Sequence, residues 1–240
     1  NYLATNASVL EDYLVQSLTK LVCRITKLGW FDDEKFREII EEVSKFIAQP
    51  SIERQVIGLR ILNSLVEEMN LPTSGRTLTV HRKTAVSFRD AALLQVFTVA
   101  ITTLKHVHAS GLASIAPGEP EGPQHRISQL ALALATASLS FDFIGTNPEE
   151  SAEDVGTVQV PSTWRPMIQD TSTMQLLFDF YAATEPPRSD KALECLVQLS
   201  SVRRSLFSGD KERTEFLQCL MSNLQNILKS CFGLGSTENY

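Results

Sequence analysis

Apolar residues recur along the chain at the three- and four-residue spacing of an amphipathic helix. The first such stretch covers residues 8–28 and ends before Gly29, which can terminate a helix. Its apolar positions, which we expect to be buried, are Leu10, Tyr13, Leu14, Leu18, Leu21, Val22, Ile25 and Leu28. A second helix is expected after Asp32 or Asp33, either of which can cap it, and it ends before Pro50. Because the connection is so short, the two helices are predicted to lie antiparallel.

Three further helix pairs follow the same pattern. They are predicted to combine residues 51–70 with 87–108, 124–141 with 162–183, and 188–202 with 210–231. Convincing strand alternation is confined to GTVQVP, residues 156–161, which lies in a loop between helices. The predicted fold class is therefore all-α.

The helix pairs are spaced like structural repeats. The first two first-helices begin about 43 residues apart, within the roughly 40–47 residues of HEAT or armadillo units. We predict an α-solenoid of antiparallel, HEAT-like helix pairs with about four repeats, in which long loops project without disturbing the core. The expected units are residues 8–50, 51–110, 123–184 and 187–232 of a single segment, 1–240, of a longer chain.

Two of the predicted loops carry opposite charge. The loop over residues 71–87, with Arg89 just beyond it, has no acid before Asp90, and its basic or titratable residues are Arg76, His81, Arg82 and Lys83. The loop over residues 142–161 has no base, and beyond Asp142 its acids are Glu149, Glu150, Glu153 and Asp154. One interpretation is that both are solvated connections. The other is that they contact a charged partner or each other, because segregated charge speeds and orients association.

Aromatic residues flank the acidic loop. In the stretch SFDFIGT, we expect Phe141 and Phe143 to be buried and to anchor the base of the acidic segment. Trp164, followed by Arg165, is expected either to pack at the seam between repeats or to be an exposed anchor for a partner.

Two adjacent cations follow a later helix. Arg203 and Arg204 either neutralise the negative end of that helix or bind an acidic partner. The charged loop residues, Trp164, Arg165 and these two arginines are together our candidate partner contacts.

Composition narrows the class of protein. With 43% hydrophobic and 21% charged residues the chain can bury a core, and a net charge of −6 argues against a general nucleic-acid binder. The sequence shows no apolar run of membrane-spanning length, so no membrane insertion is expected. The cysteines lack metal-ligand spacing and are expected to be reduced and buried; they are Cys23, Cys195, Cys219 and Cys231.

Recognisable catalytic chemistry is missing from the sequence. His106 and His108 are two residues apart, which on a helix points them in different directions and disfavours shared metal ligation. Phosphate-loop, GxGxxG, HExxH and GxSxG motifs are absent. We expect neither an enzyme nor a protein with a cofactor.

Six separated stretches, in order along the chain, resemble one known family. They are NYLA (1–4), RITKLGWFD (24–32), HRKTAVSFRD (81–90), FDFIGT (141–146), TVQVPSTWR (157–165) and CLVQLSSVRRSLF (195–207). Together they resemble the exportins of the importin-β superfamily of nuclear transport receptors. The resemblance covers nearly the whole chain, apart from residues 110–123 and the tail from Leu234, and fits an N-terminal segment of such a receptor.

The resemblance implies a carrier that shuttles between nucleus and cytoplasm. Such a receptor binds the small GTPase Ran in its GTP form together with protein cargo, meets nuclear pore proteins, and commonly holds Ran against the second helix of each pair. No contact residue is carried over from the family, so the candidate contacts above rest on charge alone. The alternative is a static HEAT-type scaffold for a multiprotein complex that ignores nucleotide state.

Overall fold

The computed structural model describes residues 2–6, 10–111, 122–143 and 157–229. These residues form an all-α array, and within them extended pairing is limited to one parallel bridge between Val158 and Val202. Val158 of the GTVQVP segment therefore pairs with the residues after α10 (Arg188–Ser200), and no described residue of that segment belongs to a strand.

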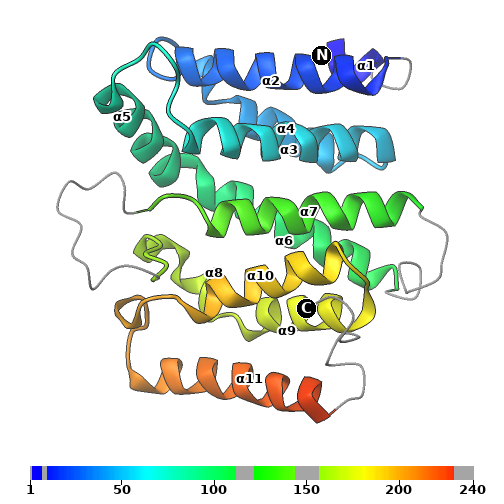
Figure 1. The fold of residues 1–240 in the computed structure, drawn as a ribbon, viewed down its shortest axis with the longest axis vertical. Helices are drawn as coiled ribbons and strands as arrows, with labels where there is room; N and C mark the ends of the chain where they lie inside the picture. The colour runs from blue at the N-terminus through cyan, green and yellow to red at the C-terminus, as the bar shows by residue number, and fades with distance from the viewer. Residues whose placement is uncertain (1, 7–9, 112–121, 144–156, 230–240) are drawn as a thin grey trace.

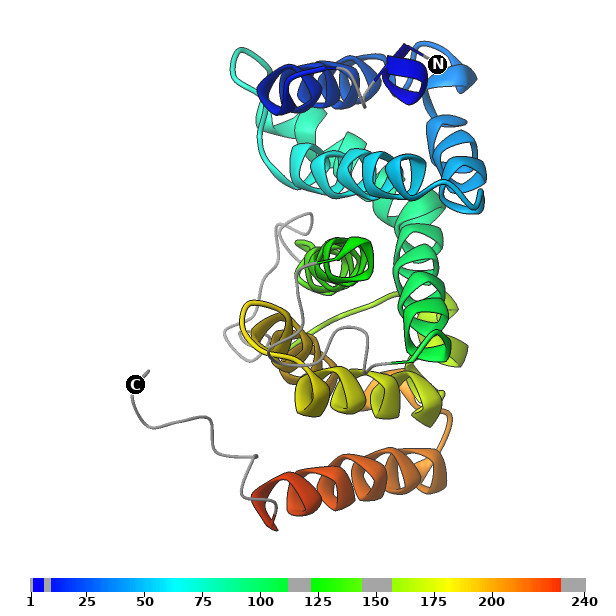
Figure 2. The same ribbon diagram turned by 90° about the vertical axis from the view of Figure 1, so that its right-hand side faces the viewer.

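Two rows of helices make up the array (Figures 1 and 2). The first row, in packing order, is α2 (Asp12–Gly29), α4 (Ile52–Asn70), α7 (Pro123–Leu139) and α10 (Arg188–Ser200). The second row is α3 (Ile39–Ile47), α6 (Leu94–Ala109), α9 (Thr171–Ala183) and α11 (Asp210–Lys229). Shorter elements are α1 (Tyr2–Asn6), η1 (Glu34–Phe36), α5 (Leu78–Phe88), the π-helical η2 (Arg89–Leu93), η5 (Ser162–Trp164), α8 (Arg165–Gln169) and η6 (Arg204–Leu206). This stacking of helices in successive layers is the predicted solenoid architecture.

Contacts between the rows join consecutive predicted units. The closest packing across the rows is α3 with α4, α6 with α7, and α9 with α10. Each of these contacts joins the second helix of one predicted unit to the first helix of the next. The division into four repeat units stays a prediction.

The predicted loop over residues 71–87 is wrong, because most of it is helix. Thr77 accepts a hydrogen bond from the backbone N–H of Val80 and so caps α5, which runs through η2 into α6 without a break. The helical run from Leu78 to Ala109 is long and apolar enough to cross a membrane, yet half of its most apolar window is buried inside the array. Core helices of water-soluble proteins have the same properties.

The expected buried face of α2 is also wrong. Tyr13, Leu21 and Ile25 are exposed, whereas the small polar face of α2 that includes Thr19 and Cys23 packs toward α4. The physical reason is position: among the described helices, α2 has a long first-row neighbour on one side only. Three apolar residues of α2 instead border a groove of about 590 Å³ between α2 and α3: Leu18, Val22 and Ile25. A helix layer with a neighbour on one side only can leave apolar residues exposed in this way.

The expectation that Phe141 and Phe143 are buried is confirmed. Phe141 is 3% exposed, and its ring centroid lies 5.8 Å from that of Phe88 and 6.0 Å from that of Phe143. Phe143 in turn meets Trp164 edge to face at 5.8 Å. A chain of aromatic rings therefore links the end of α7 to α5 and to the region before α9.

A buried lysine ties α2 to the C-terminal end of α4. Lys27 is almost fully buried, and its Nζ donates hydrogen bonds to the backbone carbonyls of Glu68 and Leu71. The last carbonyls of a helix lack partners within the helix and carry partial negative charge, so an ammonium group there is favourable. Burial lowers the pKa of Lys27 from its ordinary value.

Candidate partner-binding edge

The four first-row helices point the same way, so the segments that follow them gather along one edge (Figure 1). We define the loop edge as residues 30–33, 71–77, 140–143 and 201–209, together with α5, which continues from the second of these segments. All the described candidate contacts except Trp164 and Arg165 lie on this edge or in η2, directly after α5. The sequence could not show this convergence, because it depends on the shared direction of the helices.

Helix α5 carries the basic part of the loop edge. Arg76 and Lys83 are exposed, whereas His81 and Arg82 are half-buried. The Nζ of Lys83 lies 4.8 Å from the ring centroid of Phe31, a cation–π contact. Burial and the nearby charge of Lys27 lower the pKa of His81. At neutral pH the exposed charges of this region therefore come from Arg76 and Lys83.

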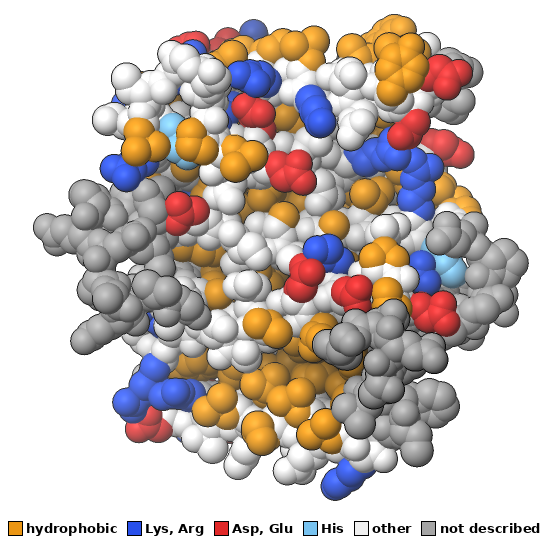
Figure 3. All heavy atoms as spheres, in the orientation of Figure 1, with side chains coloured by type: hydrophobic (Ala, Val, Ile, Leu, Met, Phe, Trp, Pro, Cys, Tyr) orange, Lys and Arg blue, Asp and Glu red, His pale blue; other side chains and the backbone are white. Residues whose placement is uncertain are grey.

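Apolar side chains surround these cations, and the sequence analysis did not include them among the candidates. Phe31, Leu71, Leu78 and Val80 are exposed, and Figure 3 shows hydrophobic and basic side chains together at this edge. Mixed apolar and cationic surface is typical of protein–protein contacts. Recognising Thr77 as a helix cap would have identified this surface, because residues 78–88 are then expected to form a helix with an exposed face.

Arg89 joins the basic region to the start of the acidic segment. Its Nη1 donates to the backbone carbonyl of Phe143 at 3.1 Å, and its Nε pairs with Asp90 at 2.7 Å. The backbone N–H of Asp142 donates to Asn70 at 2.9 Å. The base of the acidic segment is thus fixed beside η2 and α4.

The acidic candidates themselves fall outside the described residues. These are Glu149, Glu150, Glu153 and Asp154.

Trp164 is a core residue, which corrects its inclusion among the partner contacts. It has no exposed surface, and its ring stacks on Phe97 with centroids 5.2 Å apart. Arg165 uses its Nε to donate to the carbonyl of Leu206, so it connects α8 to η6. Packing at the seam is the interpretation that the structure supports for Trp164.

Arg203 and Arg204 follow the end of α10 at the loop edge. Arg203 is half-buried and its backbone N–H donates to Val158 at 3.3 Å, while the exposed Arg204 side chain pairs with Asp210. The exposed ion pair contributes little to stability, because water screens it. Arg204 is therefore the more accessible of the two for a partner.

The structure places the two histidines singled out above in different surroundings. His108 Nε2 lies 3.0 Å from Asp179 of α9, and His106 is exposed on the other side of α6. Cys23 and Cys195 are buried free thiols, as expected, whereas Cys219 is a free thiol that is only half-buried. Cys231 lies outside the described residues. Across residues 2–6, 10–111, 122–143 and 157–229, three or more His, Cys, Asp or Glu side chains nowhere gather to hold a metal ion.

No protein-family profile matches the chain. Individual proteins do match it along its whole length: exportin-7-A of Xenopus laevis at 44% identity and Ran-binding protein 17 of Homo sapiens at 41%. Exportin-7 of Dictyostelium discoideum is 36% identical over 79% of the chain. The chain belongs to the exportin family.

The match covers only part of each relative. The chain spans 22% of the length of exportin-7-A and of Ran-binding protein 17, and aligns with their N-terminal part. The loop edge described above is thus one portion of the surface that an exportin of that length presents.

Proposed function

We propose that this chain is a segment of a nuclear transport receptor that binds Ran in its GTP form together with protein cargo and carries cargo out of the nucleus. The observation that carries the proposal is 41% identity, along the whole chain, to a protein named for binding Ran. Such a receptor shuttles between nucleus and cytoplasm and contacts nuclear pore proteins on the way.

The mechanism would be linkage between two binding events. If Ran-GTP favours one curvature of the array and cargo favours the same curvature, each ligand tightens the binding of the other by the same factor. A stack of helix layers suits this mechanism, because small rotations between layers add up along the stack. The row formed by α3, α6, α9 and α11 is the face on which we place Ran, since it consists of second helices.

The loop edge would contact an acidic partner surface through Arg76, Lys83 and Arg204, which are exposed there. Exposed apolar side chains next to the first two cations, including Phe31 and Leu78, would add buried area to that contact.

The experiment that tests the function is equilibrium binding of Ran, loaded with a non-hydrolysable GTP analogue or with GDP, to the full-length protein and to this chain. Binding of the GTP form alone is expected for a carrier. Equal binding of both forms, or of neither, by the full-length protein would favour the static scaffold. Repeating the titration at a second salt concentration tests the loop edge, because charge-driven contacts weaken as salt rises.

Charge reversal at the loop edge tests the contact residues. The double variant Arg76→Glu, Lys83→Glu should weaken an edge-bound acidic partner, mainly through a slower association rate. Lys20→Glu is the matched control, because Lys20 is exposed on α2 away from this edge. If the double variant and the control changed the binding affinity equally, the loop edge would not be a binding surface. Ran would then be expected only on the row formed by α3, α6, α9 and α11.

Neutralising the acidic segment tests whether that segment contacts a basic partner. Changing Glu149, Glu150, Glu153 and Asp154 to the corresponding amides should leave the free energy of unfolding unchanged and weaken association with a basic partner. Unchanged binding at low salt would mean that the acidic segment is a connection only.

A further inference from the structure

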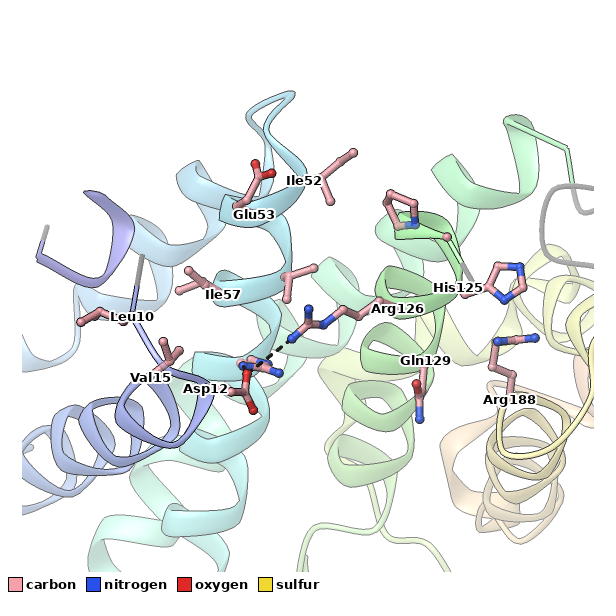
Figure 4. A pocket seen from close by; sticks show the side chains of 14 residues that line it. Leu10, Asp12, Val15, Ile52, Glu53, Ile57, His125, Arg126, Gln129 and Arg188 are labelled. Atoms are coloured by element: carbon pink, nitrogen blue, oxygen red, sulfur yellow. Dashed lines mark hydrogen bonds and ion pairs between the residues drawn. The ribbon is translucent and has the colours of Figure 1, made fainter. Parts of the chain in front are cut away.

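A cleft lies at the opposite edge of the array, where the first-row helices begin. Its volume is about 780 Å³, and it is lined by the N-terminal halves of α4 and α7, by the first turn of α2, by the first residue of α10, and by residues just before α2 and α7 (Figure 4). We call it the N-terminal cleft. Its charged and titratable lining residues are Asp12, Glu53, Arg60, His125, Arg126 and Arg188.

Both acidic side chains of the N-terminal cleft already have polar partners. Asp12 pairs with Arg60 at 2.6 Å and lies 3.7 Å from Arg126, contacts that lower the pKa of the Asp12 carboxyl. Glu53 accepts a hydrogen bond from Ser51 at 2.9 Å.

Arg188 is different from the other cations of the cleft. It is 7% exposed, and its Nε has no hydrogen-bond partner among the residues that the structure describes. Figure 4 shows its guanidinium group beside His125, at the side of the cleft away from the Asp12 pair. A nearly buried cation is thus held at the cleft without an anion.

The position of Arg188 makes this arrangement costly. It is the first residue of α10, where the helix end carries partial positive charge and repels a cation. The neighbouring α7 has no acid in its first turn and brings His125 and Arg126 to the same place. Removing a guanidinium group from water without a partner is also unfavourable. An anion in the cleft would interact favourably with the positive helix ends and with the guanidinium group, because helix N-termini and arginine both bind anions.

The walls of the N-terminal cleft indicate what kind of anion fits. Apolar side chains from α4, from α2 and from the residues just before α2 form an apolar wall of the cleft: Leu10, Val15, Ile52, Val56 and Ile57. The carboxylates of Asp12 and Glu53 border the cleft and disfavour a dianion such as phosphate more strongly than a single negative charge. A volume of about 780 Å³ is large enough for a few residues of peptide.

We propose that the N-terminal cleft binds an acidic, apolar peptide segment of a protein partner, with one carboxylate of the segment on Arg188. The apolar side chains of the peptide pack on the apolar wall, and the carboxylate accepts hydrogen bonds from the guanidinium group. The binding does not involve Ran or its nucleotide, so this proposal goes beyond the proposed transport function and fails or succeeds separately from it.

The test is fluorescence anisotropy of the full-length protein with a labelled leucine-rich peptide that carries a single glutamate. A second peptide has glutamine in place of glutamate. The acidic peptide is expected to bind the unaltered protein, and Arg188→Gln is expected to weaken it by roughly 30-fold or more, because the buried carboxylate loses its charged partner. The glutamine peptide should bind weakly to both proteins.

Two further variants separate loss of the contact from loss of the fold. Gln129→Glu adds a negative charge to the exposed rim of the cleft and should weaken the acidic peptide without disturbing the core. Arg24→Gln, on the exposed side of α2, is the matched control and should leave binding unchanged. Arg188→Gln should not lower the melting temperature, because it removes an unpaired buried charge.

Three results would overturn the proposal. They are no binding of the acidic peptide at millimolar concentration, equal affinities for Arg188→Gln and the unaltered protein, and equal affinities for the two peptides. Displacement of the acidic peptide by inorganic phosphate at matched ionic strength, with phosphate binding lost in Arg188→Gln, would reassign the cleft to a phosphate ligand.

Discussion

Truncating Phe141 to alanine tests the claim that the aromatic chain fixes the end of α7. The side chain is 97% removed from solvent, and transferring a phenylalanine ring from water into the core is worth about 1.5–3 kcal/mol. Its contacts with Phe88 and Phe143, at centroid distances of 5.8 and 6.0 Å, add about 0.5–1.5 kcal/mol each. The expected loss for Phe141→Ala is therefore in the range of about 3–5 kcal/mol that is typical of buried phenylalanines.

Urea unfolding followed by far-ultraviolet circular dichroism measures this loss. Phe31→Ala is the matched control, because it makes the same change at a ring that is 46% exposed and lies against Lys83. The control should cost about 1 kcal/mol or less. If Phe141→Ala cost no more than Phe31→Ala, the ring contacts would not hold the end of α7, and the base of the acidic segment would have to be fixed by the hydrogen bonds of Arg89 and Asn70 alone.

The remaining predictions concern buried or paired charge. Lys27→Met should lower the free energy of unfolding by about 1–3 kcal/mol, measured by urea titration, because two carbonyls at the end of α4 lose their donor. Asp12→Asn should cost at most about 1 kcal/mol at pH 7, since the Asp12 carboxylate is exposed and water screens its pair with Arg60. The lowered pKa of Asp12 means that this difference is present above pH 3.8 and disappears as pH falls through the folded-state pKa. A difference that did not shrink on acidification would contradict the pairing. Cys23 and Cys195, whose pKa values burial raises to about 12, should stay unalkylated by iodoacetamide at pH 8 in the native protein, as mass spectrometry can check; rapid labelling would mean that these helices open.

The sequence predicted the helices well where their buried faces are strongly apolar. Helix α4 begins after Ser51, whose hydroxyl accepts from the backbone N–H of Arg54, and α7 and α10 lie within one or two residues of their expected starts. Helix α5 was missed because few of its residues are buried and its cap, Thr77, follows a segment rich in turn-forming residues. A local apolar pattern predicts a helix that is stabilised by its own buried face. It does not predict α5, which is stabilised by its continuation into α6.

For a helix that packs against only one other helix of its row, the sequence did not predict which face is buried. The apolar stripe of α2, with Leu21 and Ile25, is exposed because the first row continues only on the α4 side. For Trp164 the sequence left two interpretations open, and only the stacking on Phe97 decides between them. Nothing in the sequence marks Arg188 as a candidate, because its lack of an anionic partner depends on four helix starts that meet in space.

The two tryptophans of the chain lie at opposite ends of the series of aromatic contacts that passes through Phe141. Trp30 donates to Ser87 and meets Phe88 in the half that contains α2 to α5, whereas Trp164 sits against α6 before α9. Both rings are almost completely shielded from water, so each one's fluorescence reports the opening of its own half. Variants that keep one tryptophan each would measure cooperativity directly: one shared midpoint means that the two halves unfold as a unit, and two midpoints mean that the array comes apart layer by layer.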